Sequence, residues 1–250
     1  MTEVKREMKE KEKSMNQTKL SVSNLDLYYG NFHALKNINL ELPEKEITAF
    51  IGPSGCGKST LLNLLGGIEL ATNGEIIVNG NNIAAYNDKK LTKYRATDVG
   101  FVFQFYNLIP TLTALENVDL VREICPNATA AEAALESVGL KEQRYQFPSQ
   151  LSGGEQQRIV IARAVLNSPA IILADEPTGN LDVETGKSIV ELLHNICESG
   201  SSVVMTTHNL QLLKEYPGSV YRCSEHRITD VTDEYMPRQR TIEIDLNIDN

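Results

Sequence analysis

The stretch Gly52-Pro-Ser-Gly-Cys-Gly-Lys-Ser-Thr60 decides the fold of this chain. It follows a continuous apolar run at residues 47–51 and precedes an apolar helical pattern that begins at Leu61. Such a run is typical of a buried parallel strand, and G-x-x-x-x-G-K-[ST] between a strand and a helix is typical of a phosphate-binding loop. The glycines permit a tight turn that brings backbone N–H groups around phosphates, and the helix N-terminus adds partial positive charge. The sequence therefore predicts a nucleotide site on an α/β fold.

This loop supplies side chains as well as backbone groups to the expected site. Lys58 brings a positive charge to the β- and γ-phosphates, and Ser59 offers a hydroxyl to Mg²⁺. The whole loop is predicted to contact the nucleotide: Gly52, Pro53, Ser54, Gly55, Cys56, Gly57, Lys58, Ser59 and Thr60.

A second motif places two carboxylates at the end of another predicted strand. Residues 170–174 are apolar or small, and Asp175 and Glu176 follow them directly. Ligands of open α/β sheets bind beside the carboxyl ends of strands. Asp175 is therefore expected to hold Mg²⁺, and Glu176 to polarise an attacking water. The alternative is an ordinary acidic strand end, which the phosphate-binding loop makes much weaker.

Composition and charge exclude several classes of protein. The chain has 250 residues, of which 24 are Lys or Arg and 33 are Asp or Glu, for a net charge of −9. The negative balance counts against a non-specific nucleic-acid binder, so no nucleic-acid partner is expected. No stretch approaches the roughly 18–20 apolar residues of a membrane span, and residues 1–13 lack the apolar core of a secretory signal. We therefore expect a cytoplasmic chain whose 4 cysteines are free thiols.

The pattern along the chain favours strands that alternate with helices, as in a mostly parallel sheet. Helical signals dominate residues 113–167, which resemble a subdomain inserted into that sheet. Thr113 with Glu116, and Thr129 with Glu132, fit capping boxes, and Asp182 is placed to cap a later helix. The runs expected to form strands are 20–27, 35–42, 47–51, 74–78, 99–104, 170–174 and 202–206.

The segment Leu151-Ser-Gly-Gly-Glu-Gln-Gln-Arg158 makes the identification more specific. Ser152 and Glu155 fit a capping box, and the N-terminus of the helix that follows offers a second anion site. The segment resembles the signature motif of ATP-binding-cassette (ABC) ATPases. The resemblance covers about residues 19–235 and implies one P-loop NTPase domain. Its fold would be an ABC cassette with a mixed or parallel core sheet, an antiparallel β subdomain and a helical subdomain at about 105–167.

The resemblance also implies ATP as the nucleotide and assigns further roles. Gln104 matches the glutamine that senses Mg²⁺ and contacts a membrane partner, and Asp182 belongs to the loop called the D-loop. His208 matches the switch histidine at the γ-phosphate. Tyr29 matches the aromatic residue that stacks on adenine, with Tyr28 as the alternative. The catalytic set is therefore Glu176, His208, Lys58 and Gln104; the metal ligands are Ser59, Gln104 and Asp175; and the signature contacts are Ser152, Gly153 and Gly154.

The same resemblance implies partners and a location. ABC cassettes form head-to-tail dimers in the ATP state, in which one subunit's phosphate-binding loop faces the other's signature motif. We expect a separate integral membrane, permease-like subunit to contact residues 105–112, although core packing is the alternative for that apolar segment. The protein would then be peripheral on the inner face of the cell membrane. Residues 1–18 and 236–250 are expected to be tails.

Subgroup resemblances divide along the chain. Residues 29–40 resemble phosphate-import ATPases, whereas residues 101–110, 113–118 and 175–182 resemble the macrolide-export and lipoprotein-release group. Residues 150–235 most resemble the cell-division ATPase FtsE. We expect an export or lipoprotein-release ATPase, with an FtsE-like division ATPase that signals through a membrane partner as the alternative. A soluble cassette ATPase acting on DNA or ribosomes is the least favoured class, since the net charge weighs against it.

Overall fold

A six-stranded sheet forms the centre of the computed structural model, which describes residues 18–125, 128–216 and 218–235. The strand order is β10-β9-β3-β8-β7-β6, and only β10 runs antiparallel to its neighbour. The strands are β3 (Ile47–Ile51), β6 (Val99–Val102), β7 (Ile171–Ala174), β8 (Ser202–Thr206), β9 (Ser219–Ser224) and β10 (Arg227–Asp230). Because β3, β7 and β8 are neighbours and parallel, the loops that follow them meet at one edge of the sheet.

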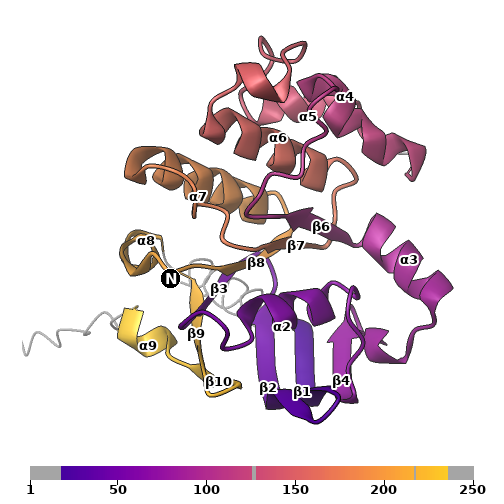
Figure 1. The fold of residues 1–250 in the computed structure, drawn as a ribbon, viewed down its shortest axis with the longest axis vertical. Helices are drawn as coiled ribbons and strands as arrows, with labels where there is room; N and C mark the ends of the chain where they lie inside the picture. The colour runs from indigo at the N-terminus through magenta and orange to yellow at the C-terminus, as the bar shows by residue number, and fades with distance from the viewer. Residues whose placement is uncertain (1–17, 126–127, 217, 236–250) are drawn as a thin grey trace, which may run out of the picture.

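A smaller antiparallel sheet packs against the first one through the helix α2 (Lys58–Leu65) (Figure 1). Its order is β2-β1-β4-β5, with β1 (Thr18–Tyr29), β2 (Phe32–Pro43), β4 (Asn73–Val78) and β5 (Asn81–Asn82). Side chains alternate between the two faces of a strand. Phe50 of β3 accordingly joins the core shared with the small sheet, whereas Ala49 and Ile51 point into a second core on the opposite face.

The second core is covered by helices. Two of them, α6 (Gly153–Val165) and α7 (Val183–Glu198), lie along this face of the large sheet (Figure 1). The remaining segments are η1 (Ile83–Ala85), α3 (Asp88–Thr97), α4 (Ala114–Asp119), η2 (Leu120–Glu123), α5 (Ala131–Ser137), η3 (Pro148–Gln150), α8 (Leu210–Glu215) and α9 (Thr232–Tyr235). Figure 1 shows α4, α5 and α6 gathered beyond β6 and β7. Among the described helices, none has the length and apolar character needed to cross a bilayer.

The α/β cassette fold with its antiparallel sheet is confirmed, but two local predictions are wrong. Thr113 and Glu116 do form a capping box at α4, whereas α5 has Ala130 at its N-cap with no side-chain hydrogen bond. The backbone N–H of Thr129 instead donates to the Leu166 carbonyl, which ties this turn to the end of α6. The strand expected at 99–104 ends at Val102, because the pairing of Val102 with Ala174 is the last one between β6 and β7.

The chain ends fall mostly outside the described residues. Of the first expected tail only Thr18 is described, and it begins β1. The expected tail at 236–250 lies outside the described residues. All 4 cysteines of the chain are described and are free thiols.

Candidate functional site

The phosphate-binding loop closes around the ammonium group of Lys58. Gly57 forms the N-cap of α2 at a φ of 109°, so the chain turns directly from the loop into the helix. The side chain of Lys58 is buried, and its Nζ donates to the carbonyl oxygens of Gly52 at 2.8 Å and Pro53 at 3.0 Å. The positive charge is thus held inside the loop, at the N-terminus of α2, where anions bind well.

Strand β9 supports this loop from behind. Gly52 has a φ of +143°, and a Cβ atom there would lie 2.2 Å from the carbonyl oxygen of Cys223. The thiol of Cys223 donates to the carbonyl oxygen of Cys56 at 2.7 Å, and burial raises the pKa of this thiol. Only glycine therefore allows the loop to approach β9 this closely, and Cys56 is held by its backbone with its side chain buried.

The hydroxyl of Thr206 organises the two carboxylates that follow β7. It donates to Asp175 Oδ1 at 2.6 Å, and it accepts the backbone N–H of Glu176 at 2.8 Å. The hydroxyl of Ser59 also donates to Asp175 Oδ1, at 3.0 Å. Asp175 consequently joins β7, β8 and the start of α2, and its carboxylate lies beside the phosphate-binding loop.

The side chains of Glu176 and His208 meet at the same edge of the sheet. His208 Nε2 lies 2.8 Å from Glu176 Oε1. Glu176 has a φ of 47°, which is a strained left-handed conformation for a residue with a side chain. Such strain is concentrated at functional sites, where the surrounding structure maintains it. Here the Thr206 hydroxyl bonded to the Glu176 N–H supplies part of that support.

Gln104 lies close to this pair, although its strand ended two residues earlier. A Cβ atom at Gly179 would be 3.3 Å from Gln104 Nε2 and 3.2 Å from Glu176 Oε2, so both side chains converge on this glycine. The Asn180 amide donates to the Gln104 carbonyl oxygen at 2.9 Å. Contacts through Thr206 therefore connect the predicted residues Ser59, Asp175, Glu176 and His208. Of the other predicted residues, Lys58 precedes Ser59 in the loop, and Gln104 lies beside the same Gly179 as Glu176.

The signature residues are built separately from that cluster. Ser152 caps α6 in a full capping box, and a Cβ atom at Gly154 would lie 2.5 Å from the Thr185 methyl group. A Cβ atom at Gly153 would meet the Tyr106 hydroxyl at 2.8 Å. Within the described ranges, no hydrogen bond or ion pair joins residues 152–154 to the loop 52–60. In the part of the chain that the structure describes, the two predicted anion sites are thus not linked by hydrogen bonds or ion pairs.

Asp182 has a structural role in the same chain. It is the N-cap of α7 and accepts from the N–H of Thr185 at 3.0 Å and from its hydroxyl at 2.6 Å. These hydrogen bonds lower the pKa of Asp182.

The two tyrosines at the end of β1 differ in their surroundings. The Tyr28 ring stacks on His33 with centroids 4.0 Å apart, and His33 is bound in turn to Asp26 at 2.7 Å. Tyr29 has 47% of its surface exposed, and its pKa is raised by burial of its hydroxyl and by hydrogen bonding to Glu69. Because Tyr29 also interacts with Thr60, it is the tyrosine that reaches the phosphate-binding loop.

Several residues of the site escaped the sequence analysis. From the sequence, Thr206 is predicted only to lie in a strand. A hydroxyl at the end of a buried strand can reach the carboxylates that end a neighbouring strand, so this position could have indicated a site residue. Asn117 is fully buried, and its amide bonds to the N–H of Ile109 and to the carbonyls of Ile109, Leu112 and Thr113. Asn117 thereby shapes the apolar segment 105–112.

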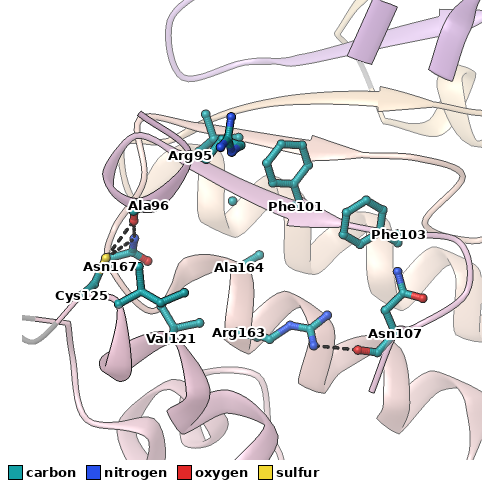
Figure 2. A pocket seen from close by; sticks show the side chains of 13 residues that line it. Arg95, Ala96, Phe101, Phe103, Asn107, Val121, Cys125, Arg163, Ala164 and Asn167 are labelled. Atoms are coloured by element: carbon teal, nitrogen blue, oxygen red, sulfur yellow. Dashed lines mark hydrogen bonds between the residues drawn. The ribbon is translucent and has the colours of Figure 1, made fainter. Parts of the chain in front are cut away.

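A pocket of about 380 Å³ opens beside this segment (Figure 2). The rings of Phe101 and Phe103 stack along one wall, with centroids 5.6 Å apart. Arg163 of α6 donates to the carbonyl oxygens of Asn107 at 2.9 Å and Tyr106 at 3.2 Å. Of the segment 105–112, only Asn107 lines this pocket. The other lining residues come from α3, β6, η2 and α6 and the turns beside them: Arg95, Ala96, Val99, Gly100, Val121, Ile124, Cys125, Ala164 and Asn167.

Comparison with known proteins decides the family. The family model described as ABC transporter matches residues 35–179, which is more than half of the chain. The chain belongs to the ABC transporter family. This cassette is 45% identical over 195 residues to an uncharacterized ABC transporter ATP-binding protein of Thermotoga maritima, covering 76% of this chain and 83% of that protein.

Another relative has a more specific description. The lipoprotein-releasing system ATP-binding protein LolD of Paramagnetospirillum magneticum is 44% identical to this cassette over 188 residues, covering 73% of this chain and 83% of the relative.

Solved structures of ABC cassettes agree with the fold. The dimeric structure of MJ0796, a protein of Methanocaldococcus jannaschii, has a TM-score of 0.75 and 38% identity, covering 84% of this chain and 96% of that one. A post-hydrolysis dimer of MJ0796 bound to ADP and Pi matches with a TM-score of 0.74 and 38% identity, over the same shares of the two chains. This cassette is therefore an ATP-binding protein of an ABC system and an ATPase.

Proposed function

We propose that this cassette is the ATP-hydrolysing subunit of an export or lipoprotein-release system, acting on a separate membrane subunit. One observation carries the catalytic part of this proposal. Lys58, Asp175 and the Glu176–His208 pair converge beside one phosphate-binding loop, at a single edge of the sheet. The likeness to lipoprotein-releasing proteins supports the type of system. An FtsE-like division function has no specific support among these relatives.

The loop residues 52–60 would bind the phosphates of ATP. Lys58 would exchange its bonds to Gly52 and Pro53 for bonds to the β- and γ-phosphates, which carry the larger charge. Tyr29 would stack on adenine, because its exposed ring lies next to Thr60 and has no stacked neighbour within the described residues. Tyr28 is already occupied by His33.

The donor set at Asp175 fits Mg²⁺. The Ser59 hydroxyl and the Asp175 carboxylate are hard oxygen ligands that lie 3.0 Å apart, and Gln104 would supply a third oxygen nearby. A bound Mg²⁺ would neutralise charge that develops on the phosphates. Glu176 would orient and polarise the attacking water, while His208 would contact the γ-phosphate and hold Glu176 in place.

Two chains would complete each other's sites. Because no hydrogen bond or ion pair among the described residues links residues 152–154 to the loop 52–60 of their own chain, we infer that they cap an ATP held by a second copy. Asp182 and its loop would lie at the same interface. ATP would then stabilise a closed dimer through contacts that ADP cannot make, and hydrolysis would release it. The dimeric MJ0796 cassette supports this arrangement.

The proposed docking site for the membrane subunit is the segment 105–112 together with the pocket of Figure 2 beside it. Its wall of Phe101 and Phe103 suits an apolar anchor, and Phe105 next to it has 71% of its surface exposed. Arg163 ties α6, which begins at the signature residues, to Tyr106 and Asn107 beside Gln104. Closure at the ATP site would therefore move the walls of this pocket.

We further propose that residues 19–235 form a single ABC ATPase domain that contains a helical subdomain at about 105–167. The protein would lie on the inner face of the membrane, held there by its membrane subunit.

Affinity capture tests this proposal. The Glu176→Gln variant, loaded with ATP and Mg²⁺, is used as bait against detergent-solubilised membranes of the source cell. We expect a membrane subunit to co-purify, and its loss to cause an export or lipoprotein-localisation defect. A partner whose loss disturbs septation would favour the division alternative, and recovery of no membrane protein would contradict the proposal.

A further inference from the structure

The helix α3 carries three lysines close together on its surface. Lys89, Lys90 and Lys93 are all exposed, and within the described residues none of them forms an ion pair. Other lysines, such as Lys141 and Lys187, are paired with glutamates. The chain as a whole carries a net charge of −9, so these three neighbouring lysines make the surface of α3 locally positive on a negatively charged protein.

The opposite side of α3 is firmly anchored. Leu91 and Tyr94 are buried, and the Tyr94 hydroxyl donates to the Leu65 carbonyl at 2.8 Å. Arg95 donates to the Gly67 carbonyl at 2.7 Å, which holds the helix against the end of α2. Residues 91, 94 and 95 share one helical face, so the three lysines project from the other. The lysines are therefore presented on a fixed scaffold.

Two of these lysines also line a pocket of about 340 Å³. Lys90 Nζ lies 5.4 Å from the centroid of the Tyr86 ring, and Asn81 donates its amide to the Asn79 carbonyl at the same rim. The floor is apolar, with Val78 and Ile83, and Tyr94 and Lys93 complete one wall. Asp98 is the only acidic residue of this lining, and the Thr97 hydroxyl donates to its carboxylate at 2.6 Å. A pocket with ammonium groups above an apolar floor suits a phosphate ester that carries a short organic group.

The position of α3 indicates where such a phosphate would come from. Arg95 and Ala96 at the end of α3 belong to the lining of the pocket in Figure 2, where we place the membrane subunit. If that subunit docks there, α3 lies beside it and next to the lipid surface. Cytoplasmic leaflets carry anionic headgroups, which attract lysines near the surface.

We propose that the lysine face of α3, with the pocket formed by Lys90 and Lys93, binds the phosphate headgroups of anionic phospholipids. That the lysines of α3 face the lipid surface rests on the proposed docking of the membrane subunit. Their binding to anionic headgroups does not depend on that subunit. Each lysine near an anionic surface contributes about a fivefold increase in binding. Through surface charge alone, the three lysines together increase the partition onto anionic vesicles by about 100-fold, and salt screens this effect. Contacts of Lys90 and Lys93 with a headgroup in the pocket add to the share of these two lysines.

Co-sedimentation of the full-length chain with lipid vesicles tests this inference. One vesicle set contains phosphatidylcholine alone, and the other contains about 30% phosphatidylglycerol. We expect binding to the anionic set only, and we expect high salt to abolish it. In the triple variant Lys89→Gln, Lys90→Gln, Lys93→Gln, binding should fall by more than the roughly 100-fold that surface charge alone accounts for. The matched control replaces three other unpaired lysines, Lys36, Lys45 and Lys214, by Gln, and should bind as the wild type does.

The pocket is tested separately from the charge. The double variant Lys90→Gln, Lys93→Gln removes both lysines of the pocket, so its affinity for anionic vesicles should fall far more per lysine than that of Lys89→Gln. An equal decrease in affinity per lysine would overturn the headgroup site. ATPase activity equal to that of the wild type verifies that the triple variant folds. Failure of the wild type to bind anionic vesicles, or an equal loss in the control variant, would overturn the inference as a whole. Because the vesicles contain no membrane subunit, this outcome is independent of the capture experiment.

Discussion

Replacing Thr206 by valine removes one hydroxyl from the centre of the proposed catalytic cluster while keeping the shape of the side chain. Thr206 is fully buried, and its hydroxyl bonds to Asp175 at 2.6 Å and to the N–H of Glu176 at 2.8 Å. Leaving the Glu176 N–H unsatisfied costs about 1–3 kcal/mol, and the bond to the Asp175 carboxylate is worth about 1.5–3 kcal/mol. We therefore expect Thr206→Val to lower the free energy of unfolding by about 2.5–6 kcal/mol.

The effect on catalysis should exceed the effect on ATP binding. Without the Thr206 hydroxyl, the strained Glu176 loses a support beside His208, and the proposed metal ligand Asp175 loses a hydrogen bond. A small misplacement of such groups lowers kcat by about 10- to 100-fold. Lys58 is not touched by the change, so the KM for ATP should rise much less.

Urea unfolding and steady-state ATPase assays measure both effects, with Thr206→Ser as the matched control. Serine keeps the hydroxyl and loses one methyl group, which costs about 1 kcal/mol of stability. It should therefore retain kcat within a few-fold of the wild type. If Thr206→Val keeps wild-type kcat and stability, or if Thr206→Ser loses as much kcat as Thr206→Val, the role given to the hydroxyl is wrong.

Three further changes test other parts of the structure. Gly52→Ala would place a Cβ 2.2 Å from the Cys223 carbonyl oxygen and should weaken ATP binding by more than about 100-fold. Gly55→Ala is the control: its φ of +78° also strains alanine, by about 1–2 kcal/mol, but its Cβ meets open space, so it should weaken ATP binding by less than about 30-fold. Similar affinities of the two variants in a fluorescent-nucleotide titration would refute the close approach at Gly52. Asn117→Ala removes the buried amide that bonds to three backbone carbonyls and one N–H. The free energy of unfolding measured in urea should therefore fall by about 3 kcal/mol, and a decrease below about 1 kcal/mol would contradict this prediction. Burial lowers the pKa of His194 below its ordinary value of 6.5, so the unfolded state binds more protons and the stability of the protein falls as the pH drops through and below 6.5. His194→Gln should therefore lose less of its thermal stability over this pH range than the wild type does. An equal dependence of the unfolding temperature on pH in the two proteins would contradict this prediction.

Local signals explain why much of this protein could be predicted from its sequence. The loop at 52–60, the capping box of Ser152 with Glu155 and the cap of α7 at Asp182 each depend on residues within a few positions of one another. Their geometry is therefore largely contained in a short pattern. The predicted β runs also have the alternation or continuous apolarity that burial requires.

Contacts between distant segments explain what the sequence did not reveal. Thr206 meets its partner Asp175 across 31 positions, and Cys223 meets Cys56 across 167. The hydrophobic pattern of a strand does not specify which strands become its neighbours in the sheet. The contacts of Thr206 with Asp175 and of Cys223 with Cys56 therefore follow only from the strand order. The same reason accounts for the wrong capping box at Thr129, whose backbone is taken by Leu166. The choice between Tyr28 and Tyr29 likewise depended on the stack with His33, which belongs to the next strand.

In the proposed mechanism, ATP binds between two copies of this cassette, and Glu176 is needed to hydrolyse it. The most direct measurement is the molar mass of Glu176→Gln in solution, with and without ATP and Mg²⁺, together with its ATPase rate. We expect the mass to double with ATP, to stay that of one chain with ADP, and hydrolysis to be almost absent. A variant that remains a single chain with ATP, or that hydrolyses ATP as fast as the wild type, would contradict the account.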